Sequence, residues 1–403
     1  MPRGHSDAPC KSVSAFPQEL IDLIAEASDA QTRKTLVFVS ASWLNAAYRC
    51  IYHTIVIFNP WSSTSQPSLR GFAQALEQGP RLRQHVRVLR LSCDICVPML
   101  LSVIEKLPNL HTIRIRSAHI QDPLNFNFPP SSLSQRSMRE ILFLNSTIVS
   151  DYSVSFQLYL SRMFARVDRL RLAGSEYIDA LEAASDHDAT LGPLASAEDR
   201  ALSTKISSLV IPKCGPGTAG YTALLTKILL RDFDLQHLTV LSVPMWPLDC
   251  CLSYAPLAAA VSTTVHKLIV DFRDPLSDIG EIHRASTVWT SLGFSSYTSV
   301  ESIHFMFLVP NEKLKIWDHI LNFLSTLSSS QRITKLIFQT AYFTDTRHNM
   351  PWSRLQDTLL AFSGVREIVF AVPYWYEEGL GGENYCPKTI LERLPLLRKK
   401  LSF

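Results

Sequence analysis

Cys93-Asp94-Ile95-Cys96 is a cysteine pair with the spacing of metal ligands. A structural zinc site takes four Cys or His ligands, and no second pair with suitable spacing follows this one. We therefore interpret Cys93 and Cys96 as thiols at the end of a buried strand. Cys250 and Cys251 are adjacent in an apolar context, which favours packing over redox chemistry. The sequence predicts no metal site.

A glycine-rich run from Cys214 to Gly220 precedes a helical pattern near Tyr221, which is the position of a phosphate-binding loop. The run lacks the Lys-Ser/Thr pair of a P-loop and the full G-x-G-x-x-G spacing, and Pro216 removes a backbone N–H. We interpret it as a tight loop. The histidines are scattered, and we find neither a nucleophilic serine motif nor a marked pair of carboxylates. We expect no cofactor and no enzyme activity.

Composition bounds the remaining classes of function. The chain has 403 residues, of which 46% are hydrophobic and 19% charged, so it can bury a sizeable core. A net charge of +3, with Lys and Arg spread along the chain, does not indicate nucleic-acid binding. No apolar run reaches the length of a membrane span, and the N-terminus lacks the apolar region of a signal peptide. We expect an intracellular protein, cytoplasmic or nuclear, with reduced cysteines and no membrane partner.

A short motif, apolar-x-x-Leu/Ile-x-apolar, recurs along most of the chain. The two residues after its first position are polar in nearly every copy, and its central Leu or Ile returns at intervals of about 24 to 39 residues, close to those of leucine-rich repeats. The ten copies span residues 86–91, 110–115, 138–143, 167–172, 206–211, 238–243, 265–270, 300–305, 333–338 and 365–370.

Most gaps between these copies carry a helical pattern of apolar residues. The segments are 98–106, 153–166, 222–232, 281–292, 312–327 and 352–362. One strand and one helix per repeat predict parallel strands with crossovers and a core that continues between stacked repeats. The fold class is therefore α/β, and the repeats resemble an irregular leucine-rich-repeat-like solenoid with outer helices. A doubly wound α/β domain is the alternative.

The segment before the repeats predicts three short helices. Pro17 suits a first helical turn, and Glu19 suits the positive end of the helix dipole. The second helix is predicted over 32–39 and the third over 41–51. About 40 residues are at the lower limit of independent stability, so we expect a partner to cover part of the apolar surface.

This segment, with Phe16-Pro17-Gln18-Glu19-Leu20-Ile21 at its start and Ser42-Trp43-Leu44 near its end, resembles an F-box of the fungal type. Ser28 departs from the Leu that the family often has there. The resemblance implies binding to a Skp-type adaptor, and through it to a cullin. It assigns the adaptor-facing or supporting positions to Phe16, Pro17, Leu20, Ile21, Ile24, Leu36, Val39 and Trp43. The alternative is a helical cap on the repeats.

The expected organisation is an adaptor-binding domain over 12–57, a Ser/Pro-rich linker over 58–79 and a substrate-binding repeat domain over 80–403. Arg114, Arg171 and Asp271 are candidates to line the concave strand face, and the alternative is that they are ordinary solvated surface residues. The aromatic run Tyr374-Trp375-Tyr376 lies on a Gly-rich loop, where it either anchors a partner or caps the final repeat.

The resemblance implies a non-catalytic substrate receptor of a ubiquitin ligase, which binds an unknown protein through the repeats. It would act by proximity, because tethering raises the effective concentration of a substrate lysine near the ubiquitin-charged enzyme. A repeat scaffold with no role in degradation is the alternative from a second class. A third is an enzyme on a doubly wound sheet, which requires a pocket at the carboxyl ends of the strands.

Overall fold

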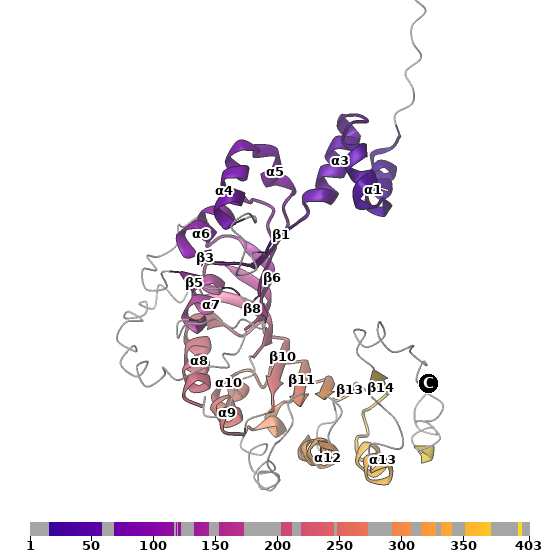
Figure 1. Ribbon diagram of the computed structural model, residues 1–403. Helices are drawn as coiled ribbons and strands as arrows, with labels where there is room; N and C mark the ends of the chain where they lie inside the picture. Colours follow the sequence, from indigo (N-terminus) through magenta and orange to yellow (C-terminus); the bar gives the residue numbers. More distant parts are fainter. Residues whose placement is uncertain are drawn as a thin grey trace, which may run out of the picture.

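A computed structural model describes the chain over most of the predicted elements. The described residues are 16–58, 68–116, 118, 120–121, 133–144, 153–172, 203–211, 219–245, 248–272, 292–307, 316–327, 332–340, 351–371 and 394–396. They form a bundle of three helices followed by a long parallel sheet that alternates with helices (Figure 1).

The bundle consists of α1 (Gln18–Ala27), α2 (Ala30–Leu36) and α3 (Ala41–Tyr52). Pro17 precedes the first residue of α1, and Asp29 caps α2 because its carboxylate accepts a hydrogen bond from the Thr32 N–H at 2.7 Å. Helix α2 ends at Leu36, before the predicted end at Val39. The next residues turn instead, since the Phe38 N–H donates to the Thr35 carbonyl and the Val39 N–H to that of Leu36.

The main sheet follows the order of the chain. Within the described residues, eleven strands pair in sequence, and all pairs are parallel. They are β1 (Thr54–Phe58), β2 (Val88–Ser92), β4 (Thr112–Arg116), β6 (Ser137–Leu144), β7 (Arg166–Arg171), β8 (Thr204–Val210), β10 (Val240–Pro244), β11 (Lys267–Phe272), β12 (Ser302–Phe307), β13 (Lys335–Thr340) and β14 (Glu367–Ala371). Strand β9 (Phe233–Asp234) pairs with β8, and β3 (Ile95–Cys96) pairs with β5 (Ile120–Gln121).

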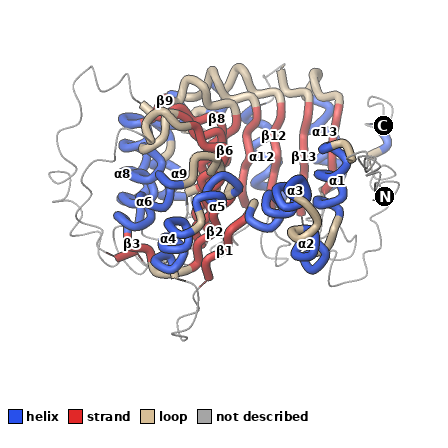
Figure 2. Tube along the Cα trace, turned by 90° about the horizontal axis from the view of Figure 1, so that it is seen from above, coloured by secondary structure: helices blue, strands red, loops and turns tan. Residues whose placement is uncertain are grey.

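The helices lie on the outer side of the curved sheet, and the strands line its inner side (Figures 1 and 2). They are α4 (Leu69–Gln78), α5 (Pro80–His85), α6 (Val97–Lys106), α7 (Ser153–Arg162), α8 (Ala219–Asp232), α9 (Leu248–Ser253), α10 (Ala255–Ala260), the short 3-10 helix η4 (Phe294–Ser296), α12 (Ile316–Leu327) and α13 (Trp352–Ala361). A doubly wound domain has helices on both faces and a reversal in strand order. The sequential order observed here excludes that alternative and confirms the solenoid.

A repeated hydrogen-bond step joins successive repeats. The His53 carbonyl accepts from the N–H groups of Arg87 and Val88, at 3.0 and 2.9 Å, and the Arg87 carbonyl accepts in the same way from His111 and Thr112. The same pairing recurs further along the chain, where the carbonyls of His111, Thr239, His266, Glu301 and Thr334 each accept from two successive N–H groups of the next repeat. Each repeat therefore fixes the start of the next strand, as in a one-dimensional stack.

The central apolar position of the motif forms the spine of the core. Register aligns it from strand to strand, and the side chains at this position are almost wholly buried from β2 to β13: Leu89, Ile113, Ile141, Leu170, Leu209, Leu241, Leu268, Ile303 and Leu336. The helices pack on this side; in α6, for example, Leu100, Val103 and Ile104 are buried. Every copy of the motif is thus part of a strand, as predicted.

Three features depart from the predicted organisation. Strand β1 is the first strand of the sheet, and Ile57 belongs to the main core, so the expected boundary near residue 57 falls inside a strand. Helix α4 lies within the expected linker and buries Leu69 and Leu76. Helices α9 and α10 occupy a gap for which no helix is predicted, and Pro256 lies in the first turn of α10.

Candidate functional site

Apolar side chains are exposed in two segments of the bundle. One segment is α1 together with Phe16, which lies just before it, and the other is the turn after α2. Their exposed fractions are 61% for Phe16, 45% for Leu20, 60% for Leu23, 42% for Ile24, 87% for Phe38 and 58% for Val39. A group of large apolar side chains left in water on one small module indicates an interaction surface.

The bundle exposes these residues because its own core is small. Ile21, Ala25 and Ala46 form that core, and Leu36, Trp43 and Cys50 pack against it. On α1, the buried side chains follow one another at a spacing of four, which is one helical turn, and the exposed apolar residues occupy the neighbouring part of the helix surface. The helix thus carries more apolar surface than α2 and α3 can cover.

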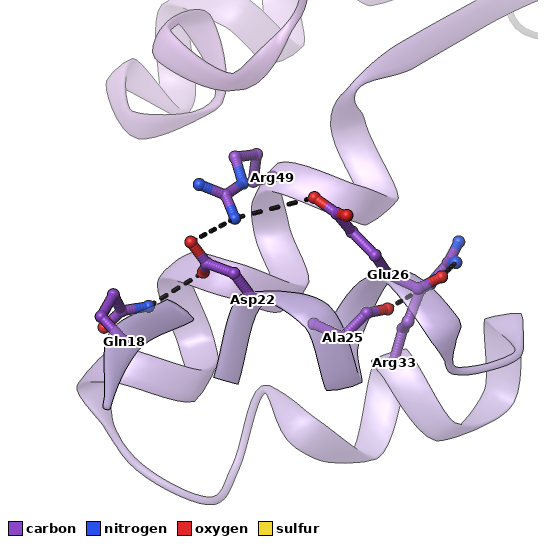
Figure 3. Close-up of polar contacts among 6 residues, drawn as sticks. All are labelled: Gln18, Asp22, Ala25, Glu26, Arg33 and Arg49. Atoms are coloured by element: carbon purple, nitrogen blue, oxygen red, sulfur yellow. Dashed lines mark hydrogen bonds and ion pairs between the residues drawn. The ribbon is translucent and has the colours of Figure 1, made fainter. Parts of the chain in front are cut away.

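Polar contacts fix α1 against α3 on another side of the helix (Figure 3). The Arg49 guanidinium of α3 lies 2.6 Å from the Asp22 carboxylate, and the Gln18 amide donates to the other oxygen of Asp22 at 2.9 Å. The hydrogen bond from Arg49 is the main cause that lowers the pKa of Asp22. These contacts orient α1, and with it the exposed apolar residues.

Arg33 of α2 donates hydrogen bonds to backbone carbonyls at the C-terminal end of α1 (Figure 3). Its Nε donates to the Ala25 carbonyl at 2.9 Å and its Nη2 to the Glu26 carbonyl at 2.6 Å. Backbone carbonyls in the last turn of a helix have no partner within the helix, so a cation here satisfies them and opposes the dipole. Arg33 and Arg49 thus connect α1 to α2 and to α3, respectively.

The predicted adaptor-binding residues differ in how far they are exposed to solvent. Phe16, Pro17, Leu20, Ile24 and Val39 are exposed, Leu36 and Trp43 are half-buried, and Ile21 is buried with 4% of its surface accessible. Ile21 can therefore only support the surface. Sequence reasoning omitted Leu23 and Phe38 from this set. The sequence does carry a signal at Phe38, which is a large apolar residue two positions before Ser40, the residue that immediately precedes α3.

The bundle is joined to the repeats without a spacer. Only His53 separates the end of α3 from the start of β1, and its carbonyl takes part in the hydrogen-bond step to β2. The Tyr48 ring of α3 meets the His85 ring of α5 edge-on, with centroids 6.1 Å apart. Burial lowers the pKa of both His53 and His85, which favours their neutral form at this joint. The joint thus combines direct chain continuity with a side-chain contact.

The inner face of the sheet holds the residues predicted to bind a substrate. Arg114 of β4 and Arg171 of β7 lie in one row across the strands, with Leu142 of β6 between them. Asp271 lies much further along the sheet, on β11, and only 7% of it is accessible. The structure thus brings the two arginines together and leaves Asp271 apart from them. Tyr374, Trp375 and Tyr376 lie outside the described residues.

The first residue of the cysteine pair, Cys93, is a buried thiol. Cys93 follows β2 and is buried, and burial raises the pKa of its thiol to about 11. Within the described part of the chain, no group of three or more His, Cys, Asp or Glu side chains is placed to hold a metal ion. Among the described helices, none has the length and hydropathy to cross a bilayer. The glycine-rich run before α8 lies almost wholly outside the described residues.

Comparison of the sequence with known protein families finds no match, and comparison with curated proteins finds none.

Proposed function

We propose that this chain is the substrate-recognition subunit of a ubiquitin ligase of the Skp-cullin-F-box type. The three-helix bundle binds a Skp-type adaptor through its exposed apolar residues, and the repeats hold a protein substrate on their inner face. The chain itself carries no chemistry in this proposal. The adaptor and cullin place the substrate near the ubiquitin-charged enzyme, inside the cell.

The observation that carries the proposal is the exposed apolar surface of the bundle. Phe16, Leu20, Ile24 and Val39 coincide with positions that the F-box resemblance assigns to the adaptor, and all are exposed. Burying a side chain of this size in a partner contributes roughly 1.5 to 3 kcal/mol before the costs of association. Several such residues together favour association with a partner.

The direct joint between bundle and solenoid also supports the proposal. A receptor that acts by proximity must hold its substrate at a defined distance from the adaptor, because effective concentration falls when the connection is long and flexible. Here α3 continues into β1 with only His53 between them. The bundle lies at the N-terminal end of the curved sheet, beside its first strand (Figure 1).

Co-purification with a Skp-type adaptor tests this proposal. The full chain and a Leu20→Asp/Ile24→Asp variant are each co-expressed with a tagged adaptor. Both side chains are about half exposed, so the charges enter the surface and not the core. We expect the unmodified chain to co-purify with the adaptor and the variant not to do so. The circular dichroism spectrum of the variant should match that of the unmodified chain.

A matched control carries the same two added charges elsewhere on the bundle. Gln31 of α2 and Asn45 of α3 are exposed polar residues, so a Gln31→Asp/Asn45→Asp variant keeps the apolar surface intact. We expect it to bind the adaptor normally. Failure of the unmodified chain to bind refutes the proposal and leaves a repeat-built interaction protein. Adaptor binding without turnover of any bound protein favours the scaffold alternative.

A further inference from the structure

Arginine side chains gather on the inner face of the first repeats. Register places Arg90 of β2 directly beside Arg114 of β4, and Leu142 lies between Arg114 and Arg171. Two further arginines lie on the same face, two residues away along their strands. The set, which we call the arginine row, is Arg90, Arg114, Arg116, Arg169 and Arg171.

The positive charge of the arginine row exceeds the negative charge beside it. Glu140 of β6 is the single carboxylate at the described inner-face positions of β1 to β7, and it contacts Arg114 at 3.0 Å and Arg169 at 3.4 Å. Asp168 at the edge of this face is held by Arg166 at 2.6 Å. Of the five arginines in the row, Arg114 and Arg169 contact this carboxylate.

Positive side chains this close together on one face repel one another. Neighbouring parallel strands are about 4.8 Å apart, so side chains of like charge in adjacent register positions repel one another. Arg90 and Arg116 are exposed residues on the inner face. A ligand of opposite charge would remove the repulsion, and a planar guanidinium pairs with a carboxylate through two parallel hydrogen bonds.

The dimensions of the arginine row define the ligand. Arg90 and Arg171 are three strand spacings apart, which is about 14 Å or four to five residues of extended chain. Beyond β7, the same row changes character and carries Val210, Ser242, Ile269, His304, Ile337 and Val369. A ligand that lies along the sheet therefore meets positive charge first and mostly uncharged, largely aliphatic side chains afterwards.

Nucleic acid fits this face poorly. Proteins that bind single strands combine positive charge with aromatic side chains on which the bases stack. The described inner-face positions of β2, β4, β6 and β7 include no aromatic residue, and the neighbouring β1 contributes one, the exposed Phe58. The whole chain also has a net charge of only +3. Carboxylate side chains of a protein suit the arginine row better.

We propose that the arginine row binds an extended protein segment with two or more Asp or Glu residues within a window of about five residues. This inference rests on the proposed function, in which that segment belongs to the substrate. Its acidic side chains pair with the arginine row, and its continuation lies over the aliphatic positions beyond β7. Glu140 holds Arg114 and Arg169 ready for this contact.

Selection of binders from a random library of peptides about twelve residues long tests the inference. The full chain is immobilised, peptides are selected and sequenced, and the affinity of the best one is measured by fluorescence anisotropy. We expect Asp and Glu to be enriched in clusters of about five positions, and binding to weaken as salt increases. In an Arg90→Glu/Arg116→Glu variant, we expect the acidic enrichment to disappear and affinity for the selected peptide to fall at least about tenfold.

The control is an Arg70→Glu/Arg81→Glu variant, which changes the net charge by the same amount. Arg70 of α4 and Arg81 of α5 are exposed on helices of the outer side, so peptide binding should be unchanged. Four results would overturn the inference: an absence of acidic enrichment, equal loss of binding in the control, binding that requires phosphorylated residues, and tighter binding of an oligothymidine. Adaptor co-purification run in parallel keeps the two proposals separate, because it depends on the bundle alone.

Discussion

Arg49 and Asp22 join the third helix of the bundle to the first, with 2.6 Å between the guanidinium and the carboxylate. Both side chains are partly exposed, at 36% and 24%, so solvent screens the pair and we expect a coupling energy of only about 0.5 kcal/mol. A double-mutant cycle of Asp22→Asn and Arg49→Gln, followed by thermal unfolding of the bundle, measures it. A coupling of zero would mean that packing alone orients α1.

Phe38 offers a second test of the docking surface. Its side chain is 87% exposed in the turn after α2, so Phe38→Asp should leave the bundle folded. If the adaptor covers this turn, we expect affinity to fall at least about tenfold, because interface aromatics carry a large share of binding energy. Titration calorimetry with the purified adaptor measures the change. Unchanged affinity would limit the interface to α1.

Ile21 should behave differently although it belongs to the same predicted set. It lies in the small core of the bundle, which is separate from the main core of the repeats. Ile21→Ala should therefore destabilise the bundle by about 2 to 4 kcal/mol and leave the unfolding of the repeats unchanged. Hydrogen exchange resolved by segment distinguishes the two. Equal loss of protection in both parts would show that they unfold as one unit.

His319 predicts a pH dependence in the last repeats. It is buried in α12, and burial lowers its pKa from an ordinary 6.5 to about 4. Between these values the unfolded chain binds a proton that the folded chain does not, so stability should fall as pH decreases from 6.5 to 4, by at most about 1.4 kcal/mol per pH unit. His319→Leu should reduce this slope in denaturant unfolding curves. An unchanged slope would assign the effect to other groups.

The repeats could be predicted from the sequence because their signal is local and recurs. Each motif copy places two apolar residues on one face of a strand, and parallel pairing then aligns copies such as Leu89 and Ile113. Tyr52, Ile55 and Ile57 at β1 fit the same mask, but they also fall within the segment that resembles an F-box, which does not predict a strand there. The boundary between the bundle and the repeats depends on the pairing of β1 with β2. A local sequence pattern does not show which strand another strand pairs with.

The candidate site could be predicted only in part. The helical spacing places Leu20, Ile21, Leu23 and Ile24 on one apolar face, and the F-box resemblance assigns Leu20, Ile21 and Ile24 to the adaptor. Neither separates the buried Ile21 from its exposed neighbours, because that depends on packing within the bundle. The row that joins Arg90 to Arg114 and Arg171 depends on register across strands that are distant in sequence. The residues of this surface are neighbours in the folded sheet but lie far apart in the sequence.

Hydrogen exchange of the full chain with and without a purified Skp-type adaptor tests the central claim most directly. If the bundle is the docking module, amides of α1 and of the turn that contains Phe38 should gain protection, while the strands from β2 to β14 should not change. Protection confined to the repeats, or none at a saturating adaptor concentration, would contradict the account.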